Sequence, residues 1–512
     1  EAITHYNKAI ELKSDYAEAH NNLGNVLSKN NNFEDAITQY KAALKLQPDY
    51  AEVHNHLGNN YHSLGNFTKA TNFCAKSLIL QPDFIEAYNS YGGALHRLEH
   101  LDGAALAYSR ALIIHPWYTA VHTNLCEIYE TSNRVKELQL TIENAKARLK
   151  KKSSDLLIYE ASLYFRQDDF ISVAKLISEI KEECVSGPRK ALFLSLKAKL
   201  LEAQKNFCAA FKTFNAMNAS IRSSTDNLKQ TSDVYFNETK DKVYQLNNLN
   251  QYVPKERSFN PSWFQPTFLI GFPRSGTTLL DTILRSHSKI DVIEERPMLE
   301  KAFNYLGRPS DISVIEATNH NLTKAASNLY LKELKKYQTK EKCFSIIDKL
   351  PLNILYLPLI HRLFPNSKFI LALRHPLDCV LSCWTQNFEL NGPMAIMTDL
   401  PRIVDFYCKT MEILEICEIR YDLKIHKIRY EDTVENFEEQ ISDVLLFLDL
   451  QWEEQLTTFQ NTALKRNLIR TPSYSQVIKP IYKDATFRWI NYAKQFDKYL
   501  KQVEPWLKKF GY

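Results

Sequence analysis

The chain has 512 residues, more than a single ordinary core accommodates, so several domains are expected. Charged residues make up 24% and hydrophobic residues 45% of it, which excludes a disordered chain, and no uncharged apolar run is long enough to span a bilayer. The 64 Lys and Arg against 59 Asp and Glu leave a net charge of +5, too small over this length to indicate a nucleic-acid partner.

An internal repeat of 34 residues occupies the beginning of the chain. Glycines, alanines and prolines recur at this interval: Gly24, Gly58 and Gly92; Ala36, Ala70 and Ala104; Pro48, Pro82 and Pro116. Each unit is predicted to form two amphipathic helices that touch at the small residues, with the proline ending the second helix. Glycine is scarce in the chain as a whole, with 12 residues where average usage would give about 36. The pattern resembles the tetratricopeptide repeat (TPR).

Helical periodicity continues beyond residue 118 without the full signature, which predicts degenerate repeats and a first domain over residues 1–217. The polar stretch 218–263 is predicted to be a helical or linker connection, and residues 264–512 to be a second domain. Because residue 1 lies inside a repeat, further repeats are expected before it. The array is expected either to bind a protein or peptide partner on a concave surface, or to act as a dimerisation or spacer arm.

From residue 266 the pattern changes to strand, loop and helix. Gly271 and Gly276 have the spacing of a loop that wraps an anion with backbone N–H groups at a helix N-terminus. Thr277 stands where nucleotide-binding loops carry a lysine, and Arg274 supplies a cation instead. An arginine fork suits the several oxygens of a phosphosulfate group.

A second strand–loop–helix segment is predicted over residues 368–384. Its strand ends in Arg374 and its helix carries Ser382, a pair suited to a terminal phosphate. Together the two segments resemble the donor-binding motifs of sulfotransferases, which take sulfate from 3′-phosphoadenosine 5′-phosphosulfate (PAPS) and release PAP. The resemblance implies a P-loop-like, three-layer α/β domain with a parallel sheet of four or five strands, and no metal.

The resemblance is closer to the tyrosylprotein sulfotransferases and their bacterial TPR-fused relatives, over about residues 264–495. It implies that Glu295, in VIEERPML, is the catalytic base and that Lys349, in IIDKLPLN, stabilises the transition state. The implied catalytic residues are Glu295, Lys349, Arg274 and Ser473, with Ser475 as the alternative to Ser473. The implied donor contacts are Arg274, Ser275, Gly276, Thr277, Thr278, Arg374, Ser382, Tyr430, Ser473, Gln476, Lys479 and Arg488.

Several alternatives stay open at this stage. Glu294 is the base if the register shifts by one residue, and Gln386 stands where the family has a second arginine. The attached repeats favour a protein or peptide tyrosine as the acceptor. A carbohydrate or a small molecule is the alternative acceptor. One competing function is that of a P-loop kinase or NTPase, in which Asp348 would end a magnesium-binding strand. The other is that of a non-catalytic TPR scaffold.

Nine cysteines are scattered along the chain without CxxC pairs. This usage favours a reduced compartment over a disulfide framework or a zinc site, and we therefore expect a cytoplasmic protein. The family's luminal disulfides and membrane anchor have no counterpart in these residues.

Overall fold

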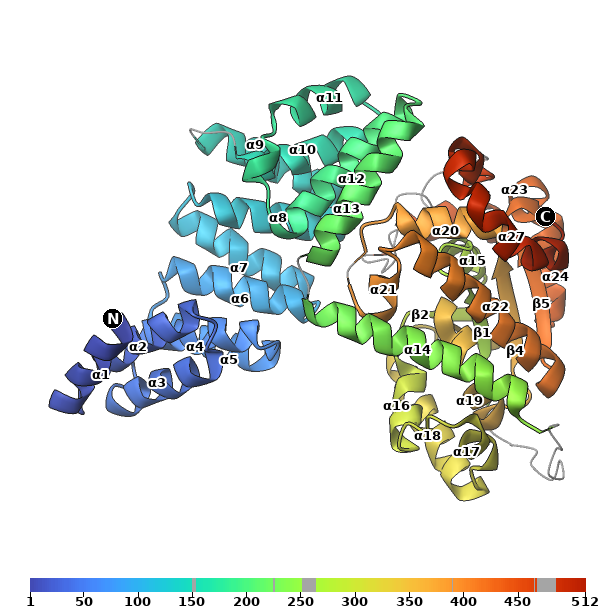
Figure 1. The fold of residues 1–512 in the computed structure, drawn as a ribbon, viewed down its shortest axis with the longest axis horizontal. Coiled ribbons are helices and arrows are strands. Elements are labelled where there is room, and N and C mark those ends of the chain that lie inside the picture. Colours follow the sequence, from blue (N-terminus) through green and yellow to red (C-terminus); the bar gives the residue numbers. More distant parts are fainter. Residues whose placement is uncertain (150–152, 224–225, 251–263, 389, 465, 467–484) are drawn as a thin grey trace. The chain divides into compact units, whose positions relative to one another are not determined.

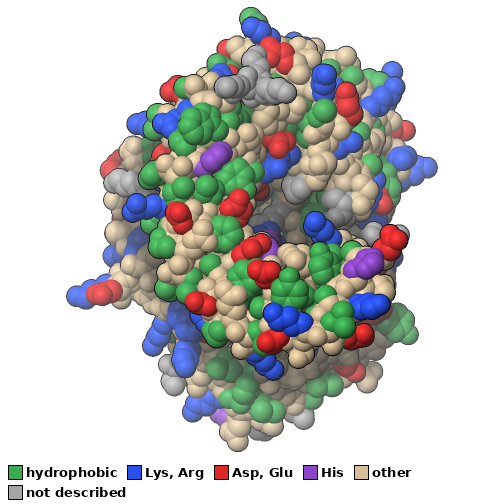
Figure 2. All heavy atoms as spheres, turned by 90° about the vertical axis from the view of Figure 1, so that its left-hand side faces the viewer, with side chains coloured by type: hydrophobic (Ala, Val, Ile, Leu, Met, Phe, Trp, Pro, Cys, Tyr) green, Lys and Arg blue, Asp and Glu red, His purple; other side chains and the backbone are tan. Residues whose placement is uncertain are grey.

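The computed structural model describes residues 1–149, 153–223, 226–250, 264–388, 390–464, 466 and 485–512. These residues form two compact units, Glu1–Val185 and Ser186–Tyr512. Among the helices of the described ranges, none is both long enough and apolar enough to cross a membrane. On the face shown in Figure 2, cationic and anionic side chains are interspersed, with apolar side chains scattered between them.

The first unit consists of helices that follow one another as antiparallel pairs (Figure 1). They are α1 (Ala2–Leu12), α2 (Ala17–Lys29), α3 (Phe33–Leu46), α4 (Ala51–Ser63), α5 (Phe67–Leu80), α6 (Ile85–Arg97), α7 (Leu101–Ile114), α8 (Thr119–Thr131), α9 (Val135–Arg148), α10 (Ser154–Arg166), α11 (Phe170–Glu179) and the short 3₁₀ helix η1 (Glu182–Cys184). The predicted repeat helices are therefore confirmed.

The glycine column marks the close approach of paired helices. A Cβ atom built on Gly24 would lie 2.6 Å from the ring of Tyr40, and one on Gly92 would lie 2.6 Å from the ring of Tyr108. The proline column ends one repeat and joins it to the next, because the carbonyl oxygen of Pro48 accepts a hydrogen bond from His54 Nε2 at 3.0 Å. The physical reasons inferred for the repeated glycines thus hold in the structure.

The second unit begins with three helices and continues as an α/β domain (Figure 1). Its elements are α12 (Gly187–Ala203), α13 (Phe207–Ser223), α14 (Asp226–Asn248), β1 (Thr267–Gly271), α15 (Thr277–Ser286), β2 (Ile290–Glu294), α16 (Met298–Tyr305), α17 (Ile312–Ala317), α18 (His320–Tyr337), β3 (Ser345–Lys349), η2 (Pro351–Tyr356), α19 (Leu357–Leu363), β4 (Lys368–Leu373), α20 (Pro376–Trp384), α21 (Gly392–Ile396), α22 (Leu400–Tyr421), β5 (Lys424–Arg429), α23 (Tyr430–Glu435), α24 (Phe437–Phe447), η3 (Glu454–Thr458), α25 (Phe459–Leu464), η5 (Arg488–Tyr492) and α27 (Ala493–Phe510). Helices α12 and α13 make most of their contacts within this second unit and are therefore part of it. The domain limits 1–217, 218–263 and 264–512 remain predictions from the sequence.

Within the described residues, five strands form one parallel sheet in the order β2-β3-β1-β4-β5. One face packs against α15, α24 and α25 through a core that includes Leu280, Val444 and Phe459. The other face carries aromatic side chains, with Phe268 of β1 against Tyr330 of α18 and Phe364 beyond α19. The sheet is therefore covered on both sides, and the predicted three-layer α/β architecture is confirmed.

Helix α13 supports α20, the helix that follows β4. The ring of Trp384, at the end of α20, lies 4.6 Å from that of Phe211 and 5.7 Å from that of Phe214. The side-chain amide of Asn218 donates a hydrogen bond of 2.9 Å to the carbonyl oxygen of Trp384. The end of α20 is thus held by a helix that precedes the sheet in the sequence.

We predict that Phe214→Ala lowers the free energy of unfolding by about 3–5 kcal/mol, because Phe214 is 0% exposed and its removal leaves a cavity against Trp384. The matched control is Phe344→Ala, at a residue that is 60% exposed. This substitution should change the free energy of unfolding by less than about 0.5 kcal/mol. Denaturant titration measures both values, and equal losses would show that α13 does not support α20.

Candidate active site

The loop between β1 and α15 is built for a close approach of backbone. A Cβ atom on Gly271 would lie 2.7 Å from the carbonyl oxygen of Ala372 in the neighbouring strand. Arg274 and Gly276 have left-handed backbone, with φ angles of 71° and 101°. The hydroxyl of Ser275 is buried, and among the described residues it has no hydrogen-bond partner. A buried donor without a partner, beside the N-terminus of α15, fits an anionic group.

The second predicted motif lies next to this loop because β4 pairs directly with β1. Arg274 Nε donates to Ser382 Oγ of α20 at 2.9 Å. Arg374 Nη1 donates to the carbonyl oxygen of Arg274 at 3.1 Å, and its guanidinium lies 5.2 Å from the ring centre of Tyr430. The structure therefore brings together Arg274, Arg374, Ser382 and Tyr430, which the sequence had placed in one site.

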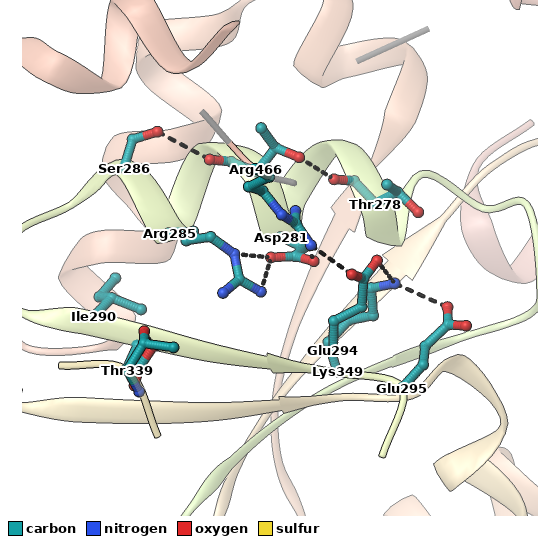
Figure 3. Close-up of polar contacts among 12 residues, drawn as sticks. Thr278, Asp281, Arg285, Ser286, Ile290, Glu294, Glu295, Thr339, Lys349 and Arg466 are labelled. Carbon is teal, nitrogen blue, oxygen red and sulfur yellow. Dashed lines mark hydrogen bonds and ion pairs between the residues drawn. The ribbon is translucent and has the colours of Figure 1, made fainter. Parts of the chain in front are cut away.

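Lys349 and Glu295 meet where β3 and β2 end side by side (Figure 3). Lys349 is 0% exposed, and its Nζ atom lies 2.9 Å from Glu295 Oε1 and 3.3 Å from Glu294 Oε1. Consecutive strand residues normally point to opposite faces. Here Glu295 has a left-handed φ of 48° and its N–H donates to the Lys349 carbonyl oxygen at 2.8 Å, so that both glutamates reach the same ammonium group.

The carboxylates keep the buried ammonium group charged. Burial alone would lower the pKa of Lys349, but the charges of Glu295 and Glu294 outweigh burial and raise the pKa above the usual lysine value. Lys349 is therefore a cation at neutral pH despite its burial, and it can stabilise negative charge that develops beside it.

A row of alternating charges continues from Glu294 into the protein (Figure 3). Arg466 Nη2 hydrogen-bonds the second oxygen of Glu294, and Arg466 Nη1 lies 3.6 Å from Asp281 Oδ2. Asp281, on the buried side of α15, also accepts from Arg285 Nε at 2.9 Å. Sequence reasoning missed Arg466 and Asp281. The only sequence signal was the single acidic residue in the apolar helical run LLDTILRS.

Asp348 lies on the opposite face of β3 from this row. Its Oδ2 atom accepts a hydrogen bond of 2.7 Å from the Tyr330 hydroxyl in α18. Burial raises the pKa of Asp348 to about 7. Asp348 thus bonds to Tyr330 rather than pairing with Lys349.

Of the remaining residues predicted to contact the donor, Arg488 lies in the described part of the chain. Arg488 Nη2 donates to Glu202 Oε1 of α12 at 2.9 Å, and the Tyr492 hydroxyl donates to the same oxygen at 2.7 Å. The next residue, Trp489, donates its backbone N–H to Asp378 Oδ1 at 2.9 Å, so η5 lies against α20. The role of Arg488 stays a prediction. Four predicted residues lie outside the described part of the chain: Ser473, Ser475, Gln476 and Lys479.

Among the described residues, no group of three or more His, Cys, Asp or Glu side chains has the arrangement of a metal site. The cysteines of these residues are in the thiol form, and several of them are buried.

Comparison with known proteins finds two kinds of domain. The model of the Sulfotransferase family matches residues 266–454, and models of the TPR repeat and the tetratricopeptide repeat match residues 1–31, 27–65 and 51–84. A protein of Aquifex aeolicus described as uncharacterized is 32% identical over 255 residues, which cover 48% of this chain and 33% of that protein.

Several further relatives carry names, among them the following two. Protein-tyrosine sulfotransferase A of Caenorhabditis elegans is 23% identical over 258 residues, covering 48% of this chain and 66% of that protein. Protein-tyrosine sulfotransferase 2 of Gallus gallus is 25% identical over 263 residues, covering 48% of this chain and 68% of that protein. The matched region thus spans 33% of the Aquifex protein, 66% of the Caenorhabditis protein and 68% of the Gallus protein.

We predict that Gly276→Ala lowers the free energy of unfolding by more than Gly307→Ala. Both glycines have positive φ, 101° and 79°, so both substitutions carry a backbone penalty of about 1–2 kcal/mol. Only at Gly276 would the added Cβ also meet a neighbour, Cδ2 of Tyr430 at 3.0 Å, whereas Gly307 has open space. Thermal unfolding of the two variants measures the difference, and equal losses would mean that the loop does not press against Tyr430.

Proposed function

We propose that this chain, which joins a sulfotransferase-family domain to tetratricopeptide repeats, transfers a sulfuryl group from PAPS to a hydroxyl group of an acceptor. The observation that carries the proposal is the convergence of Arg274, Arg374 and Ser382 beside the buried, unpartnered hydroxyl of Ser275. Two guanidinium groups and a helix N-terminus in one place suit a ligand with separate phosphate and phosphosulfate groups.

The donor residues divide between the two motifs. The loop of Arg274, Ser275 and Gly276, with Thr277 and Thr278 in the first turn of α15, would hold the phosphosulfate end. Arg374 and Ser382 would hold the 3′-phosphate. Tyr430, which already stacks on Arg374, would contact the adenosine. Bound PAPS would supply an activated sulfuryl group on a phosphate leaving group.

Glu295 is the better candidate for the general base than Glu294. Glu294 is buried, and its two oxygens contact Lys349 and Arg466. Glu295 is 27% exposed and touches Lys349 through Oε1. Glu295 would take the proton of the acceptor hydroxyl, while the ammonium group of Lys349 stabilises the negative charge that develops on transfer.

Two observations favour this chemistry over magnesium-dependent phosphoryl transfer. Thr277 occupies the position of the lysine that grips a γ-phosphate in P-loop enzymes. Asp348, the candidate magnesium ligand, lies on the far face of β3 and is bonded to Tyr330. We also propose a cytoplasmic location, because the cysteines of the described residues are in the thiol form. A protein or peptide tyrosine is favoured as the acceptor because TPR arrays offer surfaces for peptides.

We predict that PAP binds the wild-type chain and that Ser382→Ala weakens this binding by about tenfold to a hundredfold, because a hydrogen bond to a charged group contributes about 1.5–3 kcal/mol. The control is Ser286→Ala, at a helix serine whose hydroxyl donates to Thr282 and Thr462. Isothermal titration calorimetry measures the three dissociation constants. Absence of heat for the wild type at millimolar PAP would refute the donor assignment.

We also predict that Glu295→Gln lowers kcat by about a hundredfold to ten-thousandfold, since the amide cannot take up the proton that leaves the hydroxyl group of the substrate. Its dissociation constant for PAP should stay within about threefold of wild type, because Glu295 holds no part of the donor. Glu300→Gln, at an exposed residue paired with Arg308, is the control and should leave kcat unchanged. A large loss of PAP affinity in Glu295→Gln would show that Glu295 is a donor ligand instead of the base.

A further inference from the structure

Strands β4 and β5 stop pairing just before two residues assigned to the donor. Their register ends with Leu373 opposite Arg429. The next residue of each segment is a predicted donor contact, Arg374 after β4 and Tyr430 after β5. From here the segments continue as α20 and α23, beyond the ladder hydrogen bonds of the sheet. The separation of Arg374 and Tyr430 is therefore not fixed by the pairing of the strands.

The carboxylate of Glu431 joins the two segments at this point. Its Oε1 atom accepts a hydrogen bond of 3.0 Å from the backbone N–H of His375, and both residues are 5% exposed. Glu431 directly follows Tyr430 in the sequence. His375 directly follows Arg374, so this hydrogen bond connects the neighbours of both donor contacts. The cost of burying the carboxylate is reduced because His375 is the N-cap residue of α20, where the helix dipole favours negative charge.

The second oxygen of Glu431 is held by Tyr512. The Tyr512 hydroxyl donates to Oε2 at 2.9 Å, and its ring meets that of His375 edge-on, with 5.3 Å between the ring centres. The guanidinium of Arg429, at the end of β5, lies 4.5 Å from the ring centre of Tyr512 and donates to the Gly511 carbonyl oxygen at 2.9 Å. Each carboxylate oxygen of Glu431 thus has a hydrogen-bond donor, which restricts the rotation of the side chain.

We propose that Glu431 is a positioning residue for the donor: through His375 it fixes Arg374 against Tyr430. The guanidinium of Arg374 lies 5.2 Å from the Tyr430 ring centre, and Tyr430 lies against Gly276 in the loop after β1. The inference rests on the proposed function, in which Arg374 holds the 3′-phosphate and Tyr430 contacts the adenosine. Glu431 acts through its hydrogen bonds, and its negative charge is not needed.

Two substitutions at Glu431 separate hydrogen bonding from charge. Glu431→Gln keeps the length of the side chain and an oxygen that accepts from His375, so its dissociation constant for PAP should stay within about threefold of wild type. Glu431→Asp keeps the charge on a side chain too short to reach His375, and it should weaken PAP binding about tenfold. Isothermal titration calorimetry measures both constants. The opposite order, or an unchanged affinity in both variants, would overturn the inference.

Tyr512→Phe provides a second test. Loss of the hydroxyl frees one oxygen of Glu431 and should weaken PAP binding by about twofold to fivefold. In the Glu431→Asp background the same substitution should cause no further loss, whereas an additive loss would show that the hydroxyl acts without Glu431 and would contradict the proposal. Should Glu431→Asp fail to fold, Tyr512→Phe decides by itself, since an unchanged PAP affinity contradicts the proposal.

The chain offers a matched control at the opposite end of β5. The Tyr421 hydroxyl donates to Glu316 Oε1 at 2.6 Å, and the Tyr421 ring lies 4.6 Å from that of His361, a group similar to that of Tyr512. Tyr421→Phe should lower the melting temperature, as Tyr512→Phe does, and leave PAP binding unchanged. An equal loss of PAP affinity in both variants would mean that reduced stability explains the effect, and the inference would fail.

Crystal structures without ligand provide a readout that does not depend on PAP. The distance from the Arg374 guanidinium to the Tyr430 ring centre should remain near 5.2 Å in Glu431→Gln and increase in Glu431→Asp. Unchanged distances in both variants would overturn the inference. If the wild type bound no PAP, the proposed function would be refuted, and the distance in Glu431→Asp would still decide whether Glu431 fixes Arg374 against Tyr430.

Discussion

A lysine with no exposed surface keeps its charge only if anions surround it, and Lys349 meets this condition at the end of β3. The carboxylates of Glu294 and Glu295 raise its pKa against the effect of burial. Glu294 also forms an ion pair with Arg466, and Arg466 in turn lies beside Asp281. The buried charge of Lys349 is thus part of a series of ion pairs whose members come from β2, β3, α15 and residue 466 after α25.

The order of the strands decides which groups meet. In a parallel sheet all carboxyl ends lie at one edge, and the pairing of β1 with both β3 and β4 puts three such ends together. The loop after β1 therefore lies beside Arg374 from β4, while β3 and β2 bring Lys349 to Glu295. The groups to which we assign anion binding and proton acceptance therefore lie along the same edge, which is the arrangement that the proposed group transfer from an anionic donor to a hydroxyl requires.

Much of this arrangement could be predicted from spacing alone. The 34-residue interval predicted the helix pairs, and the spacing of Gly271 and Gly276 predicted the loop after β1. Both patterns are visible in the sequence because a close contact or a left-handed backbone at these positions favours glycine. The roles of Lys349 and Glu295 came from a family resemblance. Arg466 could not be predicted, since its partner Glu294 lies far away in the sequence and no local pattern relates the two. The bond between Arg488 and Glu202 was equally hidden, because it joins the end of the chain to a helix that the sequence had assigned to the repeats.

The most direct measurement of the central claim is the transfer of radiolabelled sulfate from PAPS to acceptors in a lysate of the source organism, with a metal chelator present. The account predicts that the purified chain labels a hydroxyl-bearing acceptor under these conditions and that a tyrosine residue carries the label. It would be contradicted if no label left PAPS, or if the chain instead transferred labelled phosphate from ATP and lost this activity with the chelator.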